Sequence, residues 1–409
     1  MKQIVTKQLS GGVCAPQGFR AAGVQCGLRK RQVQNDLALI VSDVAASAAA
    51  VYTQNLVQGA PLTVTKEHLQ NGKAQAIICN SGNANTCNAD GILVAKNMCA
   101  FVEQQTGIPA TDVIVASTGV IGQPLPVDLI QAAMPALALG LTYDNSDAAA
   151  RAIMTTDLAK KEVAVEFTLS GKVCKMGGIA KGSGMIHPNM ATMLVFITTD
   201  AAISPAMLQA ALSEDILDTY NMVSVDGDTS TNDMVTVLAN GLAGNPAIEN
   251  EGTDYDTFCA ALRAVNSQLC KAIAKDGEGA TKTLTCEVVG AKTALDARKA
   301  AKSIICSSLF KSAMFGADAN WGRALAAIGY AGADVEIGLV ELSFASPAGQ
   351  VDVCKFGAGI PFSEKDAKAV LLESEITILV NLHSGEGKAT AWGCDLTYDY
   401  VKINGDYRS

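Results

Sequence analysis

The sequence predicts a layered protein of the α/β or α+β class, and three observations support this prediction. The chain has 409 residues, more than one hydrophobic core usually organises, so we expect two lobes or one large layered domain. Hydrophobic residues make up 49% of the chain and charged residues 17%, which is enough apolar material to offset the entropy lost on folding. Short apolar runs alternate with segments of helical period along the whole chain.

The short apolar runs are bounded by Gly, Asn, Asp and Ser, which is typical of buried strands between turns. We predict strands at residues 76–79, 113–115, 193–197, 335–344 and 376–382. The class assignment depends on these runs because each is too short for an average helix.

Two segments show the period of an amphipathic helix. The first starts at Ser204 and Pro205, a capping residue followed by a first-turn proline, and continues to Ile216. The second has apolar residues three or four positions apart from Phe258 to Ile273, and it ends before Gly277.

Charge and hydropathy argue against nucleic-acid and membrane partners. The chain has 31 Lys and Arg against 40 Asp and Glu, a net charge of -9, and its basic run at 29–31 is short. No apolar run is long enough to cross a bilayer, and the first ten residues lack the apolar core of a signal peptide. We therefore expect a soluble cytoplasmic protein.

The residue types that hold metals or form disulfides are few or scattered. The three histidines, His68, His187 and His383, are far apart in sequence, so we expect no metal site and no His-based triad. The 12 cysteines include no C-x-x-C pair, so most of them should be small buried hydrophobes. Cys87 is the cysteine whose exposure needs checking, and no cysteine is assigned a catalytic role.

Several common site motifs are incomplete in this sequence. The glycines around Lys181 do not have the spacing of a phosphate-binding loop, and Ser183 lacks the first glycine of a nucleophile elbow. The acidic segment that starts at Asp226 lacks the glycine and the final glutamate of an EF-hand. We therefore expect no bound cofactor.

One segment carries a distinct chemical possibility. Residues 181–194 combine a glycine-rich approach, a proline turn and a small residue before Thr192, which stands at the mouth of a predicted strand. A hydroxyl nucleophile needs a base, and cleavage of the bond between Ala191 and Thr192 would expose the α-amine of Thr192 to serve as that base. The pattern alone leaves open an ordinary threonine at a strand start.

This segment resembles the self-cleaving site of the ornithine acetyltransferases, also called glutamate N-acetyltransferases, of arginine biosynthesis. Further blocks in the same order resemble that family over nearly the whole chain: residues 14–23, 80–85, 117–122, 155–157, 226–233, 276–281 and 315–323. The resemblance implies an α/β fold, an α+β layered sandwich of the N-terminal-nucleophile type. It also implies cleavage into an α chain of residues 1–191 and a β chain of residues 192–409, assembled as α2β2.

The same resemblance implies a reaction and the residues that perform it. Thr192 would take acetyl from N2-acetylornithine, release ornithine and pass the acetyl group to glutamate in a ping-pong sequence. Thr118 and Gly119 would stabilise the oxyanion, although a plain Thr-Gly turn is the alternative interpretation of these two residues alone. The substrate-binding residues implied by the family are Thr155, Lys181, Thr192, Glu278, Asn404 and Ser409.

The charges of the substrates match this set. Lys181 could bind an α-carboxylate, and Glu278 could bind the side-chain ammonium of acetylornithine. A solvated lysine and a helix-end glutamate are the alternatives for these residues taken singly. Binding by Asn404 and Ser409 would require the C-terminal tail to fold back over the site.

The sequence alone leaves three questions open. Acetyl-CoA could be a second donor, which would make the enzyme bifunctional. The acyl-enzyme could instead be hydrolysed, as in self-cleaved aminopeptidases or amidohydrolases of related fold, and a non-catalytic binding protein ranks last because Thr192, Thr118 and Gly119 are all present. His187 stands where a small residue is expected, either as a turn residue with its ring outward or close enough to the Thr192 amine to shift its pKa.

Overall fold

The computed structural model describes residues 6–29, 34–187 and 193–405, which form two compact units. Unit 1 consists of Met1–Gly182, Asn189–Leu217 and Thr229–Leu269. Unit 2 consists of Ser183–Pro188, Asp218–Asp228 and Cys270–Ser409.

Unit 1 is built on a nine-stranded mixed sheet with the order β1-β6-β7-β8-β10-β3-β4-β5, and β2 pairs with β3 outside this path. The pairs β4–β5 and β8–β10 are parallel and the others are antiparallel. The strands are β1 (Lys7–Leu9), β2 (Phe19–Val24), β3 (Leu37–Tyr52), β4 (Lys73–Asn80), β5 (Val113–Ser117), β6 (Lys161–Leu169), β7 (Lys172–Lys181), β8 (Leu194–Thr199) and β10 (Met234–Ala239).

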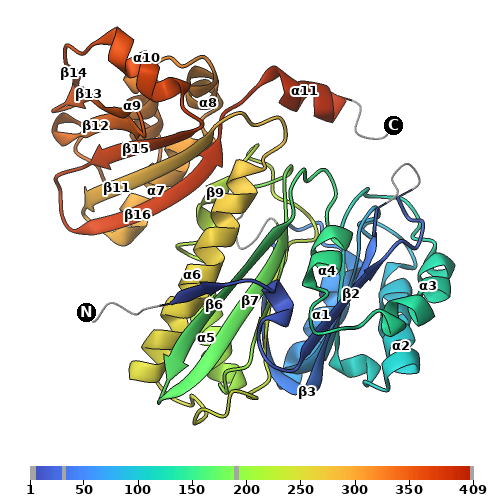
Figure 1. Cartoon of the computed structure of the whole chain (residues 1–409). Helices are drawn as coiled ribbons and strands as arrows, with labels where there is room; N and C mark the ends of the chain where they lie inside the picture. The colour runs from blue at the N-terminus through green and yellow to red at the C-terminus, as the bar shows by residue number, and fades with distance from the viewer. Residues whose placement is uncertain (1–5, 30–33, 188–192, 406–409) are drawn as a thin grey trace. The chain divides into compact units, whose positions relative to one another are not determined.

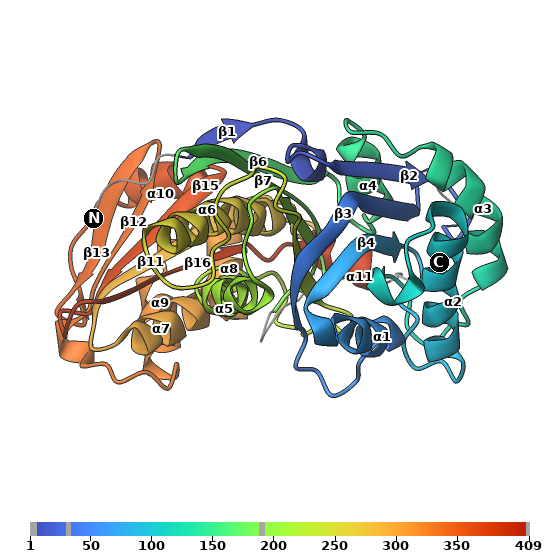
Figure 2. The same ribbon diagram turned by 90° about the horizontal axis from the view of Figure 1, so that it is seen from below.

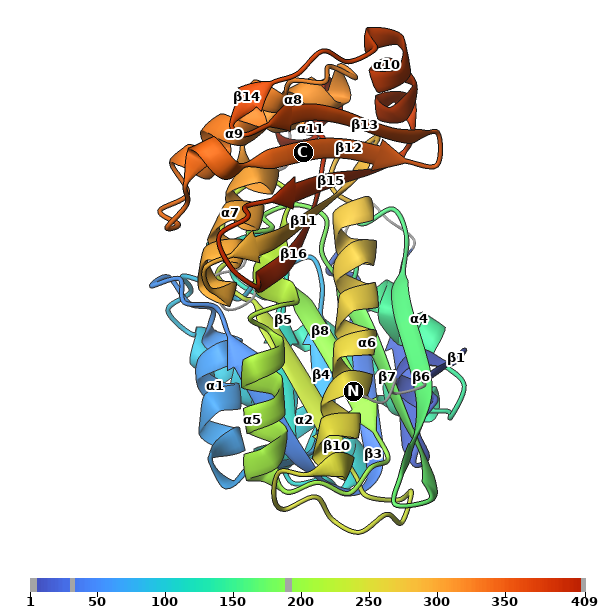
Figure 3. The ribbon, with the colours of Figure 1, turned by 90° about the vertical axis from the view of Figure 1, so that its left-hand side faces the viewer.

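Helices cover this sheet, and apolar cores lie between sheet and helices. One core joins the sheet to α4, and another joins β3, β4 and β5 to α1, α2 and α3. Helices α5 and α6 lie side by side over the sheet (Figures 2 and 3), and the Asn266 side-chain amide donates to Asp215 at 2.6 Å between them. The helices are α1 (Ala60–His68), α2 (Gly91–Thr106), α3 (Val127–Leu139), α4 (Ser146–Ala152), α5 (Pro205–Asp215) and α6 (Thr253–Lys275), which ends in unit 2.

Unit 2 contains a seven-stranded sheet with the order β14-β13-β12-β15-β11-β16-β9 (Figure 1). Helix α7 packs on β11 and β16, and α10 packs on β12 and β13. The strands are β9 (Val223–Ser224), β11 (Thr283–Ala291), β12 (Glu341–Ser346), β13 (Gly349–Lys355), β14 (Ala358–Gly359), β15 (Glu375–Asn381) and β16 (Gly387–Cys394). The helices are α7 (Ala294–Cys306), α8 (Ser308–Phe315), α9 (Trp321–Gly329), α10 (Glu364–Leu372) and α11 (Tyr398–Gly405).

Short 3-10 turns complete the described chain: η1 (Gly12–Cys14), η2 (Leu69–Asn71), η3 (Ala110–Asp112), η4 (Tyr220–Met222) and η5 (Ile337–Leu339). No helix in the described ranges is long and apolar enough to span a membrane.

The predicted elements largely match these boundaries. Strands β4 and β5 contain two of the predicted runs, and β8 and β15 match two others except at one end residue each. Ser204 caps α5 by accepting a hydrogen bond from the Met207 amide at 3.3 Å. The predicted strand at 335–344 is wrong in its first half, because Val340 N–H closes a turn onto the Ile337 carbonyl at 3.1 Å. The chain division at residue 191 stays a prediction.

Candidate active site

The predicted nucleophile Thr192 and the preceding Ala191, which form the predicted cleavage site, lie outside the described residues. The predicted substrate-binding residue Ser409 also lies outside them. The next residue, Met193, is buried, and its carbonyl accepts a hydrogen bond from the Met234 amide at 2.9 Å. Leu194 then pairs with Lys181 of β7 and with Met234 of β10. The chain that follows Thr192 is therefore held in the interior of the unit 1 sheet.

Thr118 and Gly119 follow the buried strand β5, as the sequence predicts. The Thr118 amide donates to the Asn80 carbonyl at 3.0 Å, so its hydroxyl is the donor that remains for a ligand. Gly119 has a φ of 135°, and a Cβ atom there would lie 2.3 Å from the Gly82 carbonyl carbon. Only glycine fits this close approach between two backbone segments.

A buried amide network that sequence reasoning missed supports this turn. Asn80 accepts a hydrogen bond from the Ser117 hydroxyl at 2.6 Å and donates to the Asn83 carbonyl at 2.9 Å. Asn232 donates to the carbonyls of Ala84 and Ser117 at 2.6 and 3.0 Å. These residues lie in blocks 80–85, 117–122 and 226–233, and the asparagines of the first and the last block were the available signal. The network fixes the turn from two sides.

Asp157 connects the predicted substrate residues Thr155 and Lys181. Its carboxylate accepts from the Thr155 amide at 2.9 Å, from the Gly182 amide at 2.7 Å and from the Lys161 ammonium at 2.6 Å. Burial alone would raise the pKa of Asp157, but the charges of Lys161 and Lys181 hold it at about 2. Asp157 is thus a buried anion that brings the chain at Thr155 to the end of β7, a role that the sequence did not assign.

Lys181 is a buried lysine near two carboxylates. It is 9% exposed, and its charge acts on both Asp157 and Asp233. Within the described ranges it forms no ion pair, whereas Asp157 is paired with Lys161. Burial raises the pKa of Asp233 well above its usual value, and Asp233 Oδ2 has no hydrogen-bond partner in the part of the chain described. An ammonium in this setting can bind an added carboxylate.

Glu278 and Asn404 meet in unit 2. The Asn404 side-chain amide donates to Glu278 Oε2 at 2.7 Å, so α11 at the tail does reach the predicted glutamate. Glu278 is buried, and its amide donates to the Ser183 carbonyl at 3.0 Å. Gly184 leaves room for this carboxylate, because a Cβ there would lie 2.4 Å from Glu278 Oε2.

His187 does not point outward, so that alternative is wrong. Its ring is half-buried, with Nδ1 3.2 Å from Ser224 Oγ and 3.4 Å from Cys306 Sγ. Burial lowers its pKa to about 4, and the nearby Lys302 charge adds to the effect. Its proximity to the Thr192 amine stays a prediction because Thr192 is not among the described residues.

The prediction that most cysteines are buried is confirmed, with Cys79 and Cys174 among the buried ones. All 12 are free, and Cys87 is exposed. No cluster of three metal-ligating side chains occurs within residues 6–29, 34–187 and 193–405.

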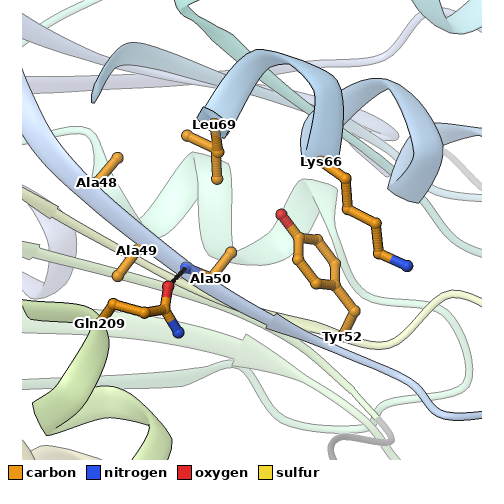
Figure 4. A pocket seen from close by; sticks show the side chains of 7 residues that line it. All are labelled: Ala48, Ala49, Ala50, Tyr52, Lys66, Leu69 and Gln209. Carbon is orange, nitrogen blue, oxygen red and sulfur yellow. Dashed lines mark hydrogen bonds between the residues drawn. The ribbon is translucent and has the colours of Figure 1, made fainter. Parts of the chain in front are cut away.

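A separate cavity of unit 1 lies between α1, α5 and β3 and contains none of the predicted site residues (Figure 4). Gln209 accepts a hydrogen bond from the Ala50 amide at 3.2 Å in its floor, and Lys66 Nζ lies 5.0 Å from the centre of the Tyr52 ring. Its lining residues are Ala48, Ala49, Ala50, Tyr52, Lys66, Leu69 and Gln209.

Comparisons with known proteins give one consistent result. Residues 20–409 match the ArgJ family. The chain is 50% identical over 402 residues to the arginine biosynthesis bifunctional protein ArgJ of Caldanaerobacter subterraneus subsp. tengcongensis, covering 98% of this chain and 99% of the relative.

Two solved structures are also similar in sequence. The arginine biosynthesis bifunctional protein ArgJ of Bacillus halodurans is 46% identical with a TM-score of 0.48, covering 52% of this chain and 97% of that one. The ornithine acetyltransferase of Mycobacterium tuberculosis, solved in complex with ornithine, is 36% identical with a TM-score of 0.42, covering 46% of this chain and 100% of that one.

Proposed function

The chain belongs to the ArgJ family, and from this membership we propose that it transfers acetyl from N2-acetylornithine to glutamate through an acetyl-Thr192 intermediate. It is a glutamate N-acetyltransferase of arginine biosynthesis, as the sequence predicted. The observation that carries the mechanistic proposal is the placement of Met193 and Leu194 in the interior of the sheet, next to the end of β7. Thr192 immediately precedes these fixed residues.

The first half-reaction forms the acyl-enzyme. After cleavage at Ala191–Thr192, the Thr192 amine takes the proton of its own hydroxyl, and the oxygen attacks the acetyl carbonyl carbon of N2-acetylornithine. The tetrahedral intermediate then collapses, the C–N bond breaks, and ornithine leaves with the proton. We assign the Thr118 hydroxyl and the Gly119 amide as oxyanion donors, each of which is typically worth about 3 kcal/mol. The hydrogen-bonded turn around Gly119 supports this assignment.

The second half-reaction transfers the acetyl group to glutamate. The amine of glutamate attacks the acetyl-Thr192 carbonyl and loses a proton to the Thr192 amine, the ester C–O bond breaks, and that proton returns to the Thr192 oxygen as N-acetylglutamate leaves. Exclusion of water from the acyl-enzyme is what separates this transferase from the hydrolase alternative.

We assign the substrate contacts by matching the charges of the side chains to those of the substrates. Lys181 binds an α-carboxylate, and its lack of an ion pair within the described residues supports this role. Glu278 binds the side-chain ammonium of acetylornithine, with Asn404 orienting the carboxylate. Thr155, placed by Asp157, and Ser409 complete the proposed set.

The proposal also covers a second acetyl donor and the assembly of the cleaved chains. The relative of Caldanaerobacter is named bifunctional, so we propose that acetyl-CoA also donates acetyl to glutamate in this chain. The cleaved chains form an α2β2 assembly. The cytoplasmic location stays a prediction from the sequence.

The test follows acetyl transfer from N2-acetylornithine with and without glutamate. The proposal predicts that continuous release of ornithine requires glutamate and that N-acetylglutamate forms in equal amount. Release of ornithine and acetate at the same rate without glutamate would establish the hydrolase instead. Replacing the donor by acetyl-CoA tests the second activity, and the absence of N-acetylglutamate would make the enzyme monofunctional.

A further inference from the structure

Arg29 holds the backbone next to Thr155, one of the proposed substrate-binding residues, although Arg29 is not among the residues assigned to acetyl transfer. Its guanidinium donates to the Met154 carbonyl at 3.0 Å through Nη1 and to the Thr155 carbonyl at 2.8 Å through Nη2. A guanidinium presents its N–H groups in a rigid planar fork. One side chain therefore fixes two neighbouring carbonyls in a single orientation.

Asp157 holds the same residue from its other side. Its carboxylate accepts a hydrogen bond from the Thr155 amide at 2.9 Å, so the amide and the carbonyl of Thr155 both have a charged partner. Hydrogen bonds to charged groups are roughly twice as strong as those between neutral groups. The backbone of Thr155 cannot turn without breaking at least one of these bonds.

The aliphatic stem of Arg29 packs on the turn that contains Gly119. A Cβ atom at Gly82 would lie 3.0 Å from Arg29 Cγ, and a Cβ atom at Gly119 would lie 2.3 Å from the Gly82 carbonyl carbon. Gly82 is therefore in close contact with both residues. The hydroxyl of the preceding residue, Ser81, donates to the Ala152 carbonyl at 2.8 Å. The turn and the chain that leads to Thr155 are thus joined by two side chains.

A buried carboxylate fixes the loop that carries Arg29. Asp36 is 0% exposed, and its carboxylate accepts hydrogen bonds at 2.5, 3.1 and 3.0 Å from the backbone amides of Cys26, Gly27 and Arg29. The carbonyl of Asp36 accepts a hydrogen bond from the Ser81 amide at 2.9 Å. The guanidinium of Arg29 is therefore presented from a backbone that is itself tied to the turn.

We propose that Arg29 is a positioning residue that holds Thr155 where it binds substrate, beside the turn of Gly119. This inference rests on the proposed function, in which Thr155 contacts the substrate and Arg29 acts only through Thr155. The alternative is a cap on the carboxyl end of helix α4. A cap would bind carbonyls within Ser146–Ala152, whereas Arg29 binds two carbonyls beyond the end of the helix.

The test measures KM and kcat for N2-acetylornithine, with glutamate as acceptor, in the full-length protein and its variants. Arg29→Met keeps a stem against Gly82 but removes the donors, so KM should rise about tenfold with kcat nearly unchanged. Arg29→Lys restores a charged donor without the planar fork, so its KM should lie between those of the parent and Arg29→Met. Arg151→Met is the matched control, because Arg151 forms an exposed ion pair with Asp147 at 2.8 Å and should leave KM unchanged.

A second measurement examines the contact without substrate. Hydrogen exchange of the peptide that contains Thr155 should be faster in Arg29→Met than in the parent, and circular dichroism shows whether each variant is folded. If Arg29→Met does not fold, Arg29→Lys serves for the same comparison. Equal KM values for the Arg29 variants and Arg151→Met in an active enzyme would overturn the proposal. A parent protein that transfers no acetyl would instead overturn the proposed function, so the two failures are distinguishable.

Discussion

Lys181, the last residue of β7, pairs across the sheet with Leu194, the first residue of β8. The antiparallel register runs from Met176–Thr199 to Lys181–Leu194, and β8 also pairs in parallel with β10. Residues on both sides of the predicted cut therefore belong to one sheet. Breaking the bond at Ala191–Thr192 would leave these hydrogen bonds intact.

The first prediction follows from this pairing. The two fragments of the cleaved protein should remain associated under native conditions, because separating them would expose the buried faces of β7, β8 and β10. Native mass spectrometry should show both fragments in one particle, and denaturing electrophoresis should separate them. Two freely separating fragments at neutral pH without denaturant would contradict the sheet arrangement.

The second prediction concerns Gly119. Gly119→Ala places a Cβ 2.3 Å from Gly82, so the turn must shift and misplace an oxyanion donor. We expect kcat to fall about 10²-fold or more, as when one such donor is removed.

Gly122→Ala is the matched control, because Gly122 also has a positive φ of 75° but has open space around its Cβ position. It should cost about 1 kcal/mol of stability through backbone strain and leave kcat nearly unchanged. Equal kcat for Gly119→Ala and Gly122→Ala would remove Gly119 from the oxyanion site.

The third prediction is the pH dependence of stability through Asp157. Its folded-state pKa of about 2 lies below the ordinary value of 3.8. A lowered pKa means that the stabilisation is present above about pH 4 and is lost as the pH falls toward about 2. Asp157→Asn removes the buried carboxylate that pairs with the Lys161 ammonium and should cost about 3–5 kcal/mol at neutral pH.

Urea unfolding of the two proteins between about pH 7 and about pH 3 measures this difference. The gap between parent and Asp157→Asn should be constant near neutrality and shrink at the acidic end. A gap that grows on acidification would show that Asp157 does not stabilise the fold as an anion.

The fourth prediction concerns the tail. Asn404→Ala removes the 2.7 Å hydrogen bond to Glu278, which should raise the KM for N2-acetylornithine about tenfold, since a hydrogen bond to a charged group is worth about 1.5–3 kcal/mol. The melting temperature should change little because α11 is exposed. Lys402→Ala on the same exposed helix should leave KM unchanged, and equal KM values for the two variants would exclude Asn404 from binding. Deletion of 403–409 should likewise damage activity more than folding.

The strands could be predicted because burial leaves a local pattern. The apolar runs at 76–79 and 113–115 lie within β4 and β5, and Ser204 marks the start of α5. The run at 335–344 failed because hydrophobicity alone does not reveal that η5 precedes β12. The strand order could not be predicted, since pairing joins segments far apart in sequence.

The sequence named candidate site residues but not the contacts between them. Thr118 and Gly119 were assigned from their block, yet the hydrogen bonds of Asn80 and Asn232 to this turn depend on folding over long sequence separations. Asp157 lay in a recognised block without an assigned role. The contact of His187 with Cys306 spans 119 positions, which no local motif can show.

The most direct test of the acyl-enzyme is the denatured intact mass of the purified protein, measured with and without N2-acetylornithine added just before quenching. The mechanism predicts two fragments that match 1–191 and 192–409, with one acetyl group added to the second fragment only when the donor is present. Thr192→Ala should remain one chain and gain no acetyl group. A single 42.3 kDa species that never gains acetyl from the donor would contradict the nucleophile and the cleavage together.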